Sequence, residues 1–371
     1  MRSRSKFPKK ASFLVATAIN TVTSVGTGRS LQPLNGKDVS MKILTLSAML
    51  SFLAFSILPA QAAGLQLIEV PEDTLGPAIA GAVWYPCAGT PTEINIAGFD
   101  MKAVQDCPIS GTKHPFVVVS HGAGGTFGNY HGLAELLADN GFIVAAINHP
   151  LDSGQSKVRN PGDIASMVQR PMDISRLIDF IFYNWPEGAR IDAIRVGFIG
   201  YSRGAFTGLG LVGADPDWKR LLDNCPVYPG NRFCEQIRSG PIAPMSHDGR
   251  IKAAVIVDSP AGPLFPSSGL RDITVPLQFW ASERGGDGVS PDDAAMIVEN
   301  LPIKADLRVV PNSGHFSFLP PCTMEFARRT AEDEPELCTD KTGFDRAAFH
   351  KQFDAEILAF FRKNIVEVTK P

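Results

Sequence analysis

The chain has 371 residues, of which 44% are hydrophobic and 20% are charged, and its formal net charge is −3. These values are typical of a globular protein that is large enough to bury one sizeable core or two small ones. A chain with this charge lacks the excess of basic residues that binding to a polyanion needs, so we expect no nucleic-acid partner.

The first 62 residues have the pattern of an export leader. Met41 and Lys42 precede an apolar stretch of sixteen residues, 43–58, and residues 59–63 have the sequence Pro-Ala-Gln-Ala-Ala. A short charged start, an apolar stretch too short to span a bilayer comfortably and an A-x-A site are typical of a signal peptide. We therefore expect translation from Met41, cleavage after Ala62 and an exported protein, periplasmic or secreted, with no transmembrane span in the mature chain.

Residues 1–40 are basic and poor in acids, which leaves a longer targeting leader and a retained signal anchor as alternatives. The segment 1–62 holds eight basic residues and one acidic residue, so its removal leaves 27 basic and 37 acidic residues. The mature net charge of −10 is a further reason to exclude a nucleic-acid partner.

All six cysteines lie in the part of the chain that follows the leader. An even number of cysteines behind an export signal predicts disulfides, and each neighbouring pair brackets a polar or Pro/Gly-rich loop. We therefore favour pairing between neighbours, which gives Cys87–Cys107, Cys225–Cys234 and Cys322–Cys338. Neither C-x-x-C nor H-E-x-x-H nor a paired Cys/His spacing occurs, so we expect no metal site.

Apolar runs rich in β-formers alternate with amphipathic helices along the mature chain. About eight strands are predicted, and the later ones are continuously apolar, which is typical of parallel strands covered on both faces. The first two runs lie close together and predict an antiparallel edge of the sheet. The predicted strands cover residues 66–70, 80–85, 115–120, 142–148, 194–199, 252–257, 276–281 and 306–310.

Apolar residues at helical spacing predict helices over residues 133–140, 171–185 and 349–360, and Ser290-Pro291 is typical of a helix start. A long Pro- and Gly-rich insert, residues 214–250, interrupts the alternation. The pattern predicts a single α/β domain over residues 63–371, with a mostly parallel central sheet and the insert as a cap-like region over the site.

A serine stands between two glycines directly after the apolar run 194–199. Gly200, Ser202 and Gly204 form the pattern G-x-S-x-G, in which a nucleophilic serine occupies a sharp turn between a strand and a helix. The backbone passes so close to the residues on either side that a side chain there would clash, which explains the glycines. The pattern predicts Ser202 as a nucleophile.

A nucleophilic serine needs a histidine as base, and sites built on this elbow place the acid and then the histidine after the serine in the chain. His315 follows the last predicted strand and is the histidine that combines this order with a suitable position. For the acid we favour Asp287, in the loop after residues 276–281. Asp258, which directly follows residues 252–257, is the alternative, and Glu283 ranks third.

Backbone N–H groups must also stabilise the oxyanion of an acyl-transfer reaction. Residues 121–125 (His-Gly-Ala-Gly-Gly) follow the third predicted strand, and their glycines allow a substrate to approach the backbone. We expect the N–H of Ala123 and that of Arg203, the residue after the nucleophile, to be the two donors.

Residues 115–122, 140–149, the Ser202 elbow and residues 314–316 resemble secreted bacterial α/β-hydrolases known as predicted dienelactone hydrolases, and also platelet-activating-factor acetylhydrolases. The resemblance implies an α/β-hydrolase fold and a carboxylic-ester hydrolase with no cofactor. True dienelactone hydrolases use a cysteine nucleophile, so Ser202 argues against lactone opening. The acetylhydrolases place their acid where Asp258 stands, whereas the bacterial relatives place it where Asp287 stands.

The chain is thus predicted to hydrolyse short-chain or lipid-like esters through an acyl-enzyme on Ser202, with His315 as base. A cutinase-like polyester hydrolase is one alternative. A non-catalytic binding protein on the same fold is an alternative from another class. The sequence leaves the oligomeric state open.

Overall fold

The computed structural model describes residues 61–96, 98–157, 160, 162–227, 230 and 232–367, which fall within one compact unit, Leu58–Pro371. The predicted start at Met41 and the apolar stretch 43–58 lie outside the described residues. Within the described ranges, no helix is both long and apolar enough to cross a membrane.

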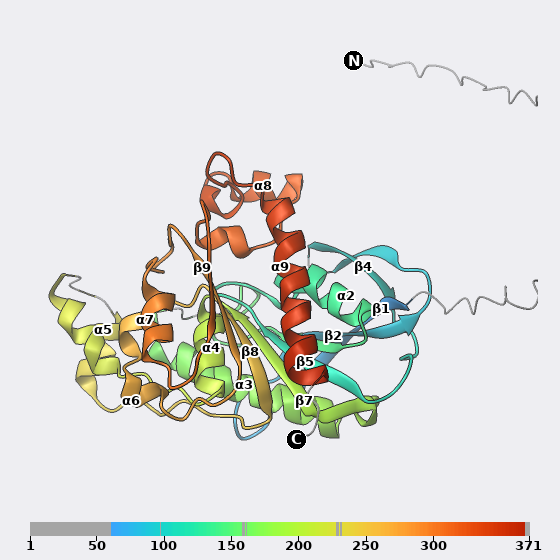
Figure 1. Ribbon diagram of the computed structural model, residues 1–371, viewed down its shortest axis with the longest axis horizontal. Coiled ribbons are helices and arrows are strands. Elements are labelled where there is room, and N and C mark those ends of the chain that lie inside the picture. The colour runs from blue at the N-terminus through green and yellow to red at the C-terminus, as the bar shows by residue number, and fades with distance from the viewer. Residues whose placement is uncertain are drawn as a thin grey trace, which may run out of the picture. The chain divides into compact units, whose positions relative to one another are not determined.

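Ten strands of the described chain form one mixed sheet in the spatial order β10-β9-β8-β7-β5-β6-β2-β1-β4-β3 (Figure 1). Their bounds are β1 (Gln61–Val70), β2 (Ile79–Ala88), β3 (Thr92–Ile96), β4 (Phe99–Gln105), β5 (His114–Ser120), β6 (Ile143–Ile147), β7 (Ile191–Tyr201), β8 (Ile251–Val257), β9 (Leu277–Ser282) and β10 (Asp306–Val310).

The centre of the sheet is parallel, as predicted. Each pair from β10 through β9, β8, β7 and β5 to β6 is parallel, and every residue of β5, β6 and β9 is buried. Continuous burial explains why these strands are mostly apolar rather than alternating. All eight predicted strands are present, and the parallel pairing from β10 to β6 aligns the carboxyl ends of these central strands along one edge.

The other end of the sheet departs from the prediction. β1 and β2 are antiparallel, as expected, but they do not form the edge, because β4 pairs with β1 at Gly64 and Leu65 and β3 follows. The β3–β4 hairpin escaped prediction because β3 is largely exposed and holds few apolar residues.

Helices cover both faces of the sheet. The α-helices are α2 (His131–Asp139), α3 (Ile164–Tyr183), α4 (Arg203–Leu211), α5 (Arg232–Ser239), α6 (Ser267–Leu270), α7 (Asp293–Asn300), α8 (Met324–Thr330) and α9 (Arg346–Phe361). Short 3-10 or π turns are η1 (Phe127–Tyr130), η2 (Gly188–Arg190), η3 (Trp218–Val227), η4 (Gly262–Leu264), η5 (His315–Phe318), η6 (Pro335–Leu337) and η7 (Arg362–Val366).

Two apolar clusters, one on each face, hold these helices to the sheet. Leu177 of α3, Leu209 of α4 and Ile297 of α7 are fully buried in one cluster. Leu137 of α2 and Phe353 of α9 are fully buried in the other, and α9 is the red helix of Figure 1. The structure is therefore the predicted α/β arrangement of a mostly parallel sheet between helical layers.

Helix α3 begins earlier than predicted. The carboxylate of Asp163 accepts a hydrogen bond from Ala165 N at 3.0 Å and caps the helix, so that Pro171 lies inside it rather than at its start. Proline usually breaks a helix interior because it lacks an N–H donor. The added turns carry Arg170 into the protein interior, which matters for the site below.

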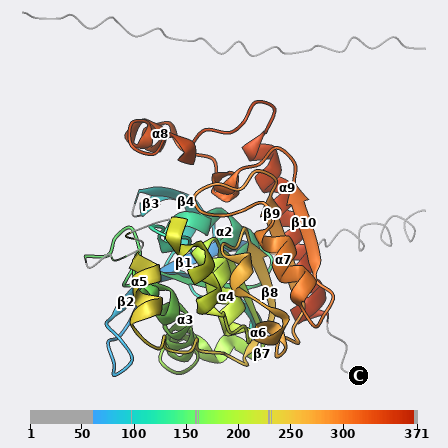
Figure 2. The same cartoon turned by 90° about the vertical axis from the view of Figure 1, so that its left-hand side faces the viewer.

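The three disulfides join neighbouring cysteines, as predicted: Cys87–Cys107, Cys225–Cys234 and Cys322–Cys338. The second closes a loop within the insert 214–250, which holds η3 and α5. The third closes the segment that holds α8 and η6, which projects away from the sheet in both views (Figures 1 and 2).

The insert lies against the start of α3. Ile164 N donates to Gln236 Oε1 at 2.8 Å, and Arg232 forms an ion pair with Asp163 at 3.1 Å. On its other side, the Trp218 ring packs 5.7 Å from that of Phe206 in α4.

Candidate active site

Ser202 occupies a strained turn between β7 and α4. Its backbone has φ 56° and ψ −121°, a region that residues with a side chain rarely adopt and that costs about 1–3 kcal/mol. The turn is held because Ser202 N donates to Val257 O at 2.8 Å and Ala205 N donates to Ser202 O at 2.8 Å. The serine therefore stands at the carboxyl end of the sheet, as the elbow pattern predicts.

The two glycines of the elbow lie against backbone. A Cβ added to Gly200 would lie 2.0 Å from Gly204 O, and one added to Gly204 would lie 2.0 Å from Ser120 O. Real Cβ atoms do not come so close to other atoms, so both positions require glycine. The close approach of Gly204 to Ser120 also brings the ends of β5 and β7 together.

Ser202, His315 and Asp258 form one hydrogen-bonded chain. His315 Nε2 lies 3.0 Å from Ser202 Oγ, and His315 Nδ1 lies 2.6 Å from Asp258 Oδ2. All three residues are buried. Because the carboxylate accepts, the imidazole carries its proton on Nδ1, and Nε2 is free to accept the serine proton.

Asp258, the alternative acid of the sequence analysis, is the carboxylate in contact with His315. It directly follows β8 with φ 50°, and its two oxygens also accept from Ser282 N at 2.6 Å and Ser282 Oγ at 2.9 Å. These bonds come from the end of the neighbouring strand β9. The side chain is thus fixed with its remaining lone pair toward the histidine.

Asp287, the acid favoured on sequence, lies elsewhere. It is exposed in a turn closed by the Gly286–Val289 bridge, and no hydrogen bond joins it to His315 within the described part of the chain. Glu283 is also exposed and accepts from Asn312 N at 2.8 Å. The loop after β9 still supports the histidine, because Gly285 O accepts from His315 N at 2.8 Å.

Aromatic packing fixes the imidazole plane. The ring of Tyr201 stacks on that of His315 at 4.8 Å with an interplanar angle of 22°, and its hydroxyl donates to His315 O at 3.1 Å. Burial raises the pKa of Tyr201 well above its ordinary value, so the phenol remains a donor. The histidine is held in both its ring and its backbone.

A second layer supports the histidine loop η5. Tyr130 donates its hydroxyl to Phe318 O at 3.0 Å, and His350 Nε2 donates to Ser317 O at 3.1 Å. Burial, with a smaller contribution from the Arg346 charge, lowers the pKa of His350 to about 4. His350 is therefore neutral at physiological pH.

The glycine loop after β5 lies beside the serine. A Cβ on Gly122 would lie 3.2 Å from Ser202 Cβ, so the loop passes close to Ser202. Ala123 is exposed, and none of the described residues accepts a hydrogen bond from its N–H. Arg203 begins α4, where backbone N–H groups point out of the helix end. The two predicted donors thus flank Ser202.

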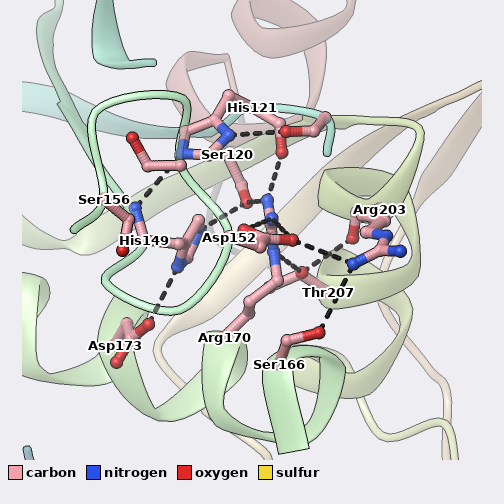
Figure 3. A network of polar contacts seen from close by, with 12 residues as sticks. Ser120, His121, His149, Asp152, Ser156, Ser166, Arg170, Asp173, Arg203 and Thr207 are labelled. Atoms are coloured by element: carbon pink, nitrogen blue, oxygen red, sulfur yellow. Dashed lines mark hydrogen bonds and ion pairs between the residues drawn. The ribbon is translucent and has the colours of Figure 1, made fainter. Parts of the chain in front are cut away.

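A second Ser–His–Asp arrangement lies beneath the first. Ser120 Oγ is 2.9 Å from His149 Nε2, and His149 Nδ1 is 3.0 Å from Asp173 Oδ2 (Figure 3). Burial lowers the pKa of His149 well below its ordinary value and raises the pKa of Asp173 to about 7. Ser120 has 0% exposure, so a substrate cannot reach it.

Sequence reasoning missed this buried group. The charged side chains of Arg170, Asp152 and Asp173 are all buried in the protein interior. Arg170 and Asp173 lie on the buried face of α3. A helix face that should be apolar but carries an arginine and an aspartate is the signal that could have revealed them. Among the described residues, no cluster of three His, Cys, Asp or Glu side chains could hold a metal ion.

Two comparisons with known proteins find similarity to ester hydrolases. The family described as platelet-activating factor acetylhydrolase, isoform II, matches residues 93–159. This segment holds the glycine loop and His149 but not Ser202, Asp258 or His315. The predicted resemblance to the acetylhydrolases is confirmed over that segment. No curated protein matches the chain in sequence.

Among solved structures, the chain is similar to a ferulic acid esterase from Streptomyces cinnamoneus. The TM-score is 0.55 at 19% sequence identity, over 86% of this chain and 94% of that one. This likeness confirms the predicted α/β-hydrolase fold. In all, 1116 chains of solved structures match. A shared fold alone does not select an activity.

Replacing Gly204 by alanine tests the close contact at the elbow. We expect Gly204→Ala to lower the free energy of unfolding by about 3 kcal/mol, because the new Cβ would meet Ser120 O. The control is Gly132→Ala in α2, where a Cβ meets nothing within 4 Å and alanine should stabilise the helix by about 0.5–1 kcal/mol. Denaturant unfolding measures both, and equal effects would contradict the proposed contact.

The depressed pKa of His350 predicts a loss of stability in acid. Its pKa is about 4 in the folded state and about 6.5 in the unfolded chain, so the unfolded chain binds the proton first as pH falls. The stabilisation is complete above pH 6.5 and is lost between pH 6.5 and 4. Over this window the unfolding free energy of the wild type should fall more steeply than that of His350→Gln, by about 1.4 kcal/mol per pH unit. Identical slopes of unfolding free energy against pH in the two proteins would contradict the lowered pKa of His350 in the folded state.

Proposed function

We propose that the protein is a serine carboxylic-ester hydrolase. The observation that carries the proposal is the hydrogen-bonded chain from Ser202 Oγ through His315 to Asp258, at 3.0 Å and 2.6 Å. The strained backbone of Ser202 supports it, because such strain persists where the surrounding structure holds it for function.

In the first half of the reaction, Ser202 Oγ attacks the ester carbonyl while His315 Nε2 takes its proton. Asp258 accepts from Nδ1–H, holds the imidazole in this tautomer and stabilises the imidazolium that forms. The N–H groups of Ala123 and Arg203 donate to the oxyanion. His315 then protonates the leaving alcohol, and an acyl-enzyme on Ser202 remains.

In the second half, His315 accepts a proton from water, which attacks the acyl carbonyl. The second tetrahedral intermediate uses the same two donors. Its collapse returns the proton from His315 to Ser202 Oγ and releases the carboxylic acid. The residues of the site account for each proton transfer.

For the substrate we propose short-chain acyl esters or lipid-like esters. The family that matches residues 93–159 is named for acetyl hydrolysis of platelet-activating factor, and the similar structure is named a ferulic acid esterase. We further propose that the insert 214–250 lies over the part of the site that would hold the acyl group of the ester. The packing of Trp218 on Phe206 supports this placement. Two assays separate hydrolysis of short-chain or lipid-like esters from a cutinase-like activity. One uses a panel of soluble p-nitrophenyl esters of increasing chain length, and the other uses an insoluble polyester film.

Removing the nucleophile tests whether the protein is an enzyme at all. A fluorophosphonate should label the wild type on Ser202, found by peptide mass spectrometry, and should not label the buried Ser120. Ser202→Ala should lose both labelling and p-nitrophenyl ester turnover while its thermal unfolding stays cooperative. A wild type that neither labels nor turns over any ester would instead indicate a binding protein.

Matched substitutions test the acid. Asp258→Asn should lower kcat by about 10⁴, because the amide cannot hold the tautomer that His315 needs, whereas Asp287→Asn should leave kcat within about twofold. Steady-state kinetics on one p-nitrophenyl ester measure both. A large loss in Asp287→Asn with little loss in Asp258→Asn would reverse the assignment.

We propose that the protein is exported and that the leader ends at Ala62. The three disulfides among the described residues support an oxidising compartment. β1 begins at Gln61, which pairs with Ala88, so cleavage after Ala62 would shorten this strand by two residues and leave the rest paired with β2. The intact mass of the protein expressed in its exported form should correspond to a start at Ala63, and a retained leader would contradict the proposal.

A further inference from the structure

Arg170 is a fully buried cation directly beneath the proposed site. Its side chain is 1% exposed and reaches from α3 toward the ends of β5 and β7 (Figure 3). Burying a guanidinium is costly unless a charge partner and hydrogen-bond acceptors surround it. The hydrogen-bond acceptors of Arg170 therefore show which segments the buried guanidinium connects.

One set of contacts leads to the glycine loop. Arg170 Nη2 donates to His121 O and, at 3.1 Å, to Ser120 Oγ. Arg170 Nη1 donates to both oxygens of Asp152, at 2.6 Å and 2.9 Å, and Asp152 O in turn accepts from Gly124 N at 2.9 Å. The peptides on either side of the Ala123 N–H are thus fixed by Arg170 and its ion-pair partner.

The other set of contacts leads to the elbow. Arg170 Nε donates to Thr207 Oγ1 at 3.0 Å, and the Thr207 hydroxyl donates to Arg203 O at 2.8 Å. The Arg203 side chain donates to Asp152 Oδ2 at 3.3 Å. One guanidinium is therefore joined to both neighbours of Ala123, directly to His121 and through Asp152 to Gly124, and through Thr207 to Arg203.

We propose that Arg170 is a positioning residue that sets the distance between the Ala123 and Arg203 N–H groups, an inference that rests on the proposed ester hydrolysis. The planar guanidinium is suited to this role because its donors point in fixed directions. Nη2 donates to the start of the loop, and Nε donates to Thr207, which is bonded to the elbow. An oxyanion hole requires donors about 2.7–3.1 Å from the oxyanion, and the glycines of this loop have no side chains that could fix its position.

The buried Ser120–His149–Asp173 group completes this support. Because Ser120 Oγ accepts from Arg170, its own hydrogen is available to His149 Nε2, and His149 Nδ1–H is then donated to Asp173. His149 N also donates to His121 Nε2 at 3.1 Å. The group resembles a catalytic triad, but it holds the start of the glycine loop in place.

Thr207 offers the sharpest test, because valine has nearly the same shape and lacks the hydroxyl that joins Arg170 to Arg203. In Thr207→Val we expect kcat to fall about 10-fold to 100-fold with KM within about twofold. Affinity for a trifluoromethyl ketone, whose adduct with Ser202 places an oxyanion between the two donors, should fall in the same ratio as kcat/KM. Thr207→Ser, which keeps the hydroxyl, should restore both quantities to near the wild-type values.

Arg170→Lys is the second variant, because lysine keeps the charge but cannot span the loop, Asp152 and Thr207 together. It should lose at least as much kcat as Thr207→Val. If both variants unfold at lower temperature yet keep the wild-type kcat and ketone affinity, Arg170 is only structural and the proposal is overturned.

Hydrogen exchange separates failure of this inference from failure of the proposed function. If the wild type shows no turnover and no ketone adduct, ester hydrolysis is refuted, and the Gly124 amide still reports on the loop. Faster exchange at Gly124 in Arg170→Lys than in the wild type would support Arg170 as the residue that fixes the loop. Unchanged exchange would contradict it.

Discussion

The contact between Gly204 and the carbonyl of Ser120 is the constraint on which the site depends. Only glycine lets the start of α4 pass so close to the end of β5. This approach brings the glycine loop close to Ser202, and the parallel order of β5, β7 and β8 then places Asp258 on the far side of the same edge. The carboxyl ends of neighbouring strands thus carry Ser202, Asp258 and the glycine loop.

The layer beneath this edge is polar, which is unusual inside a protein. An ion pair between Arg170 and Asp152, both essentially unexposed, would be costly without further hydrogen bonds. Burial lowers the pKa of Arg170, but the guanidinium keeps an acceptor for each of its nitrogens. The polar layer thereby connects the loop and the elbow through hydrogen bonds to one guanidinium. Apolar packing could not do this, because the glycines of the loop have no side chains to pack.

Much of the fold and part of the site could be predicted from sequence, and the limits have physical causes. A motif and chain order lead to Ser202 and His315, and the structure brings these two side chains together. The carboxylate that contacts His315 could not be chosen from sequence, because Asp258 and Asp287 both follow strands. The contact depends on the positive φ of Asp258 and on its bonds to Ser282. The burial and contacts of Arg170 could not be predicted, because its hydrogen-bond partners come from segments that are far apart in sequence.

The most direct measurement of the central claim is to trap the covalent intermediate. The wild type is mixed with a p-nitrophenyl ester, quenched in acid within the first turnovers and digested for mass spectrometry. The structure predicts an added acyl mass on the peptide that holds Ser202 and on no other residue. Ester turnover with the acyl group on another residue, or the absence of both adduct and turnover, would contradict the account.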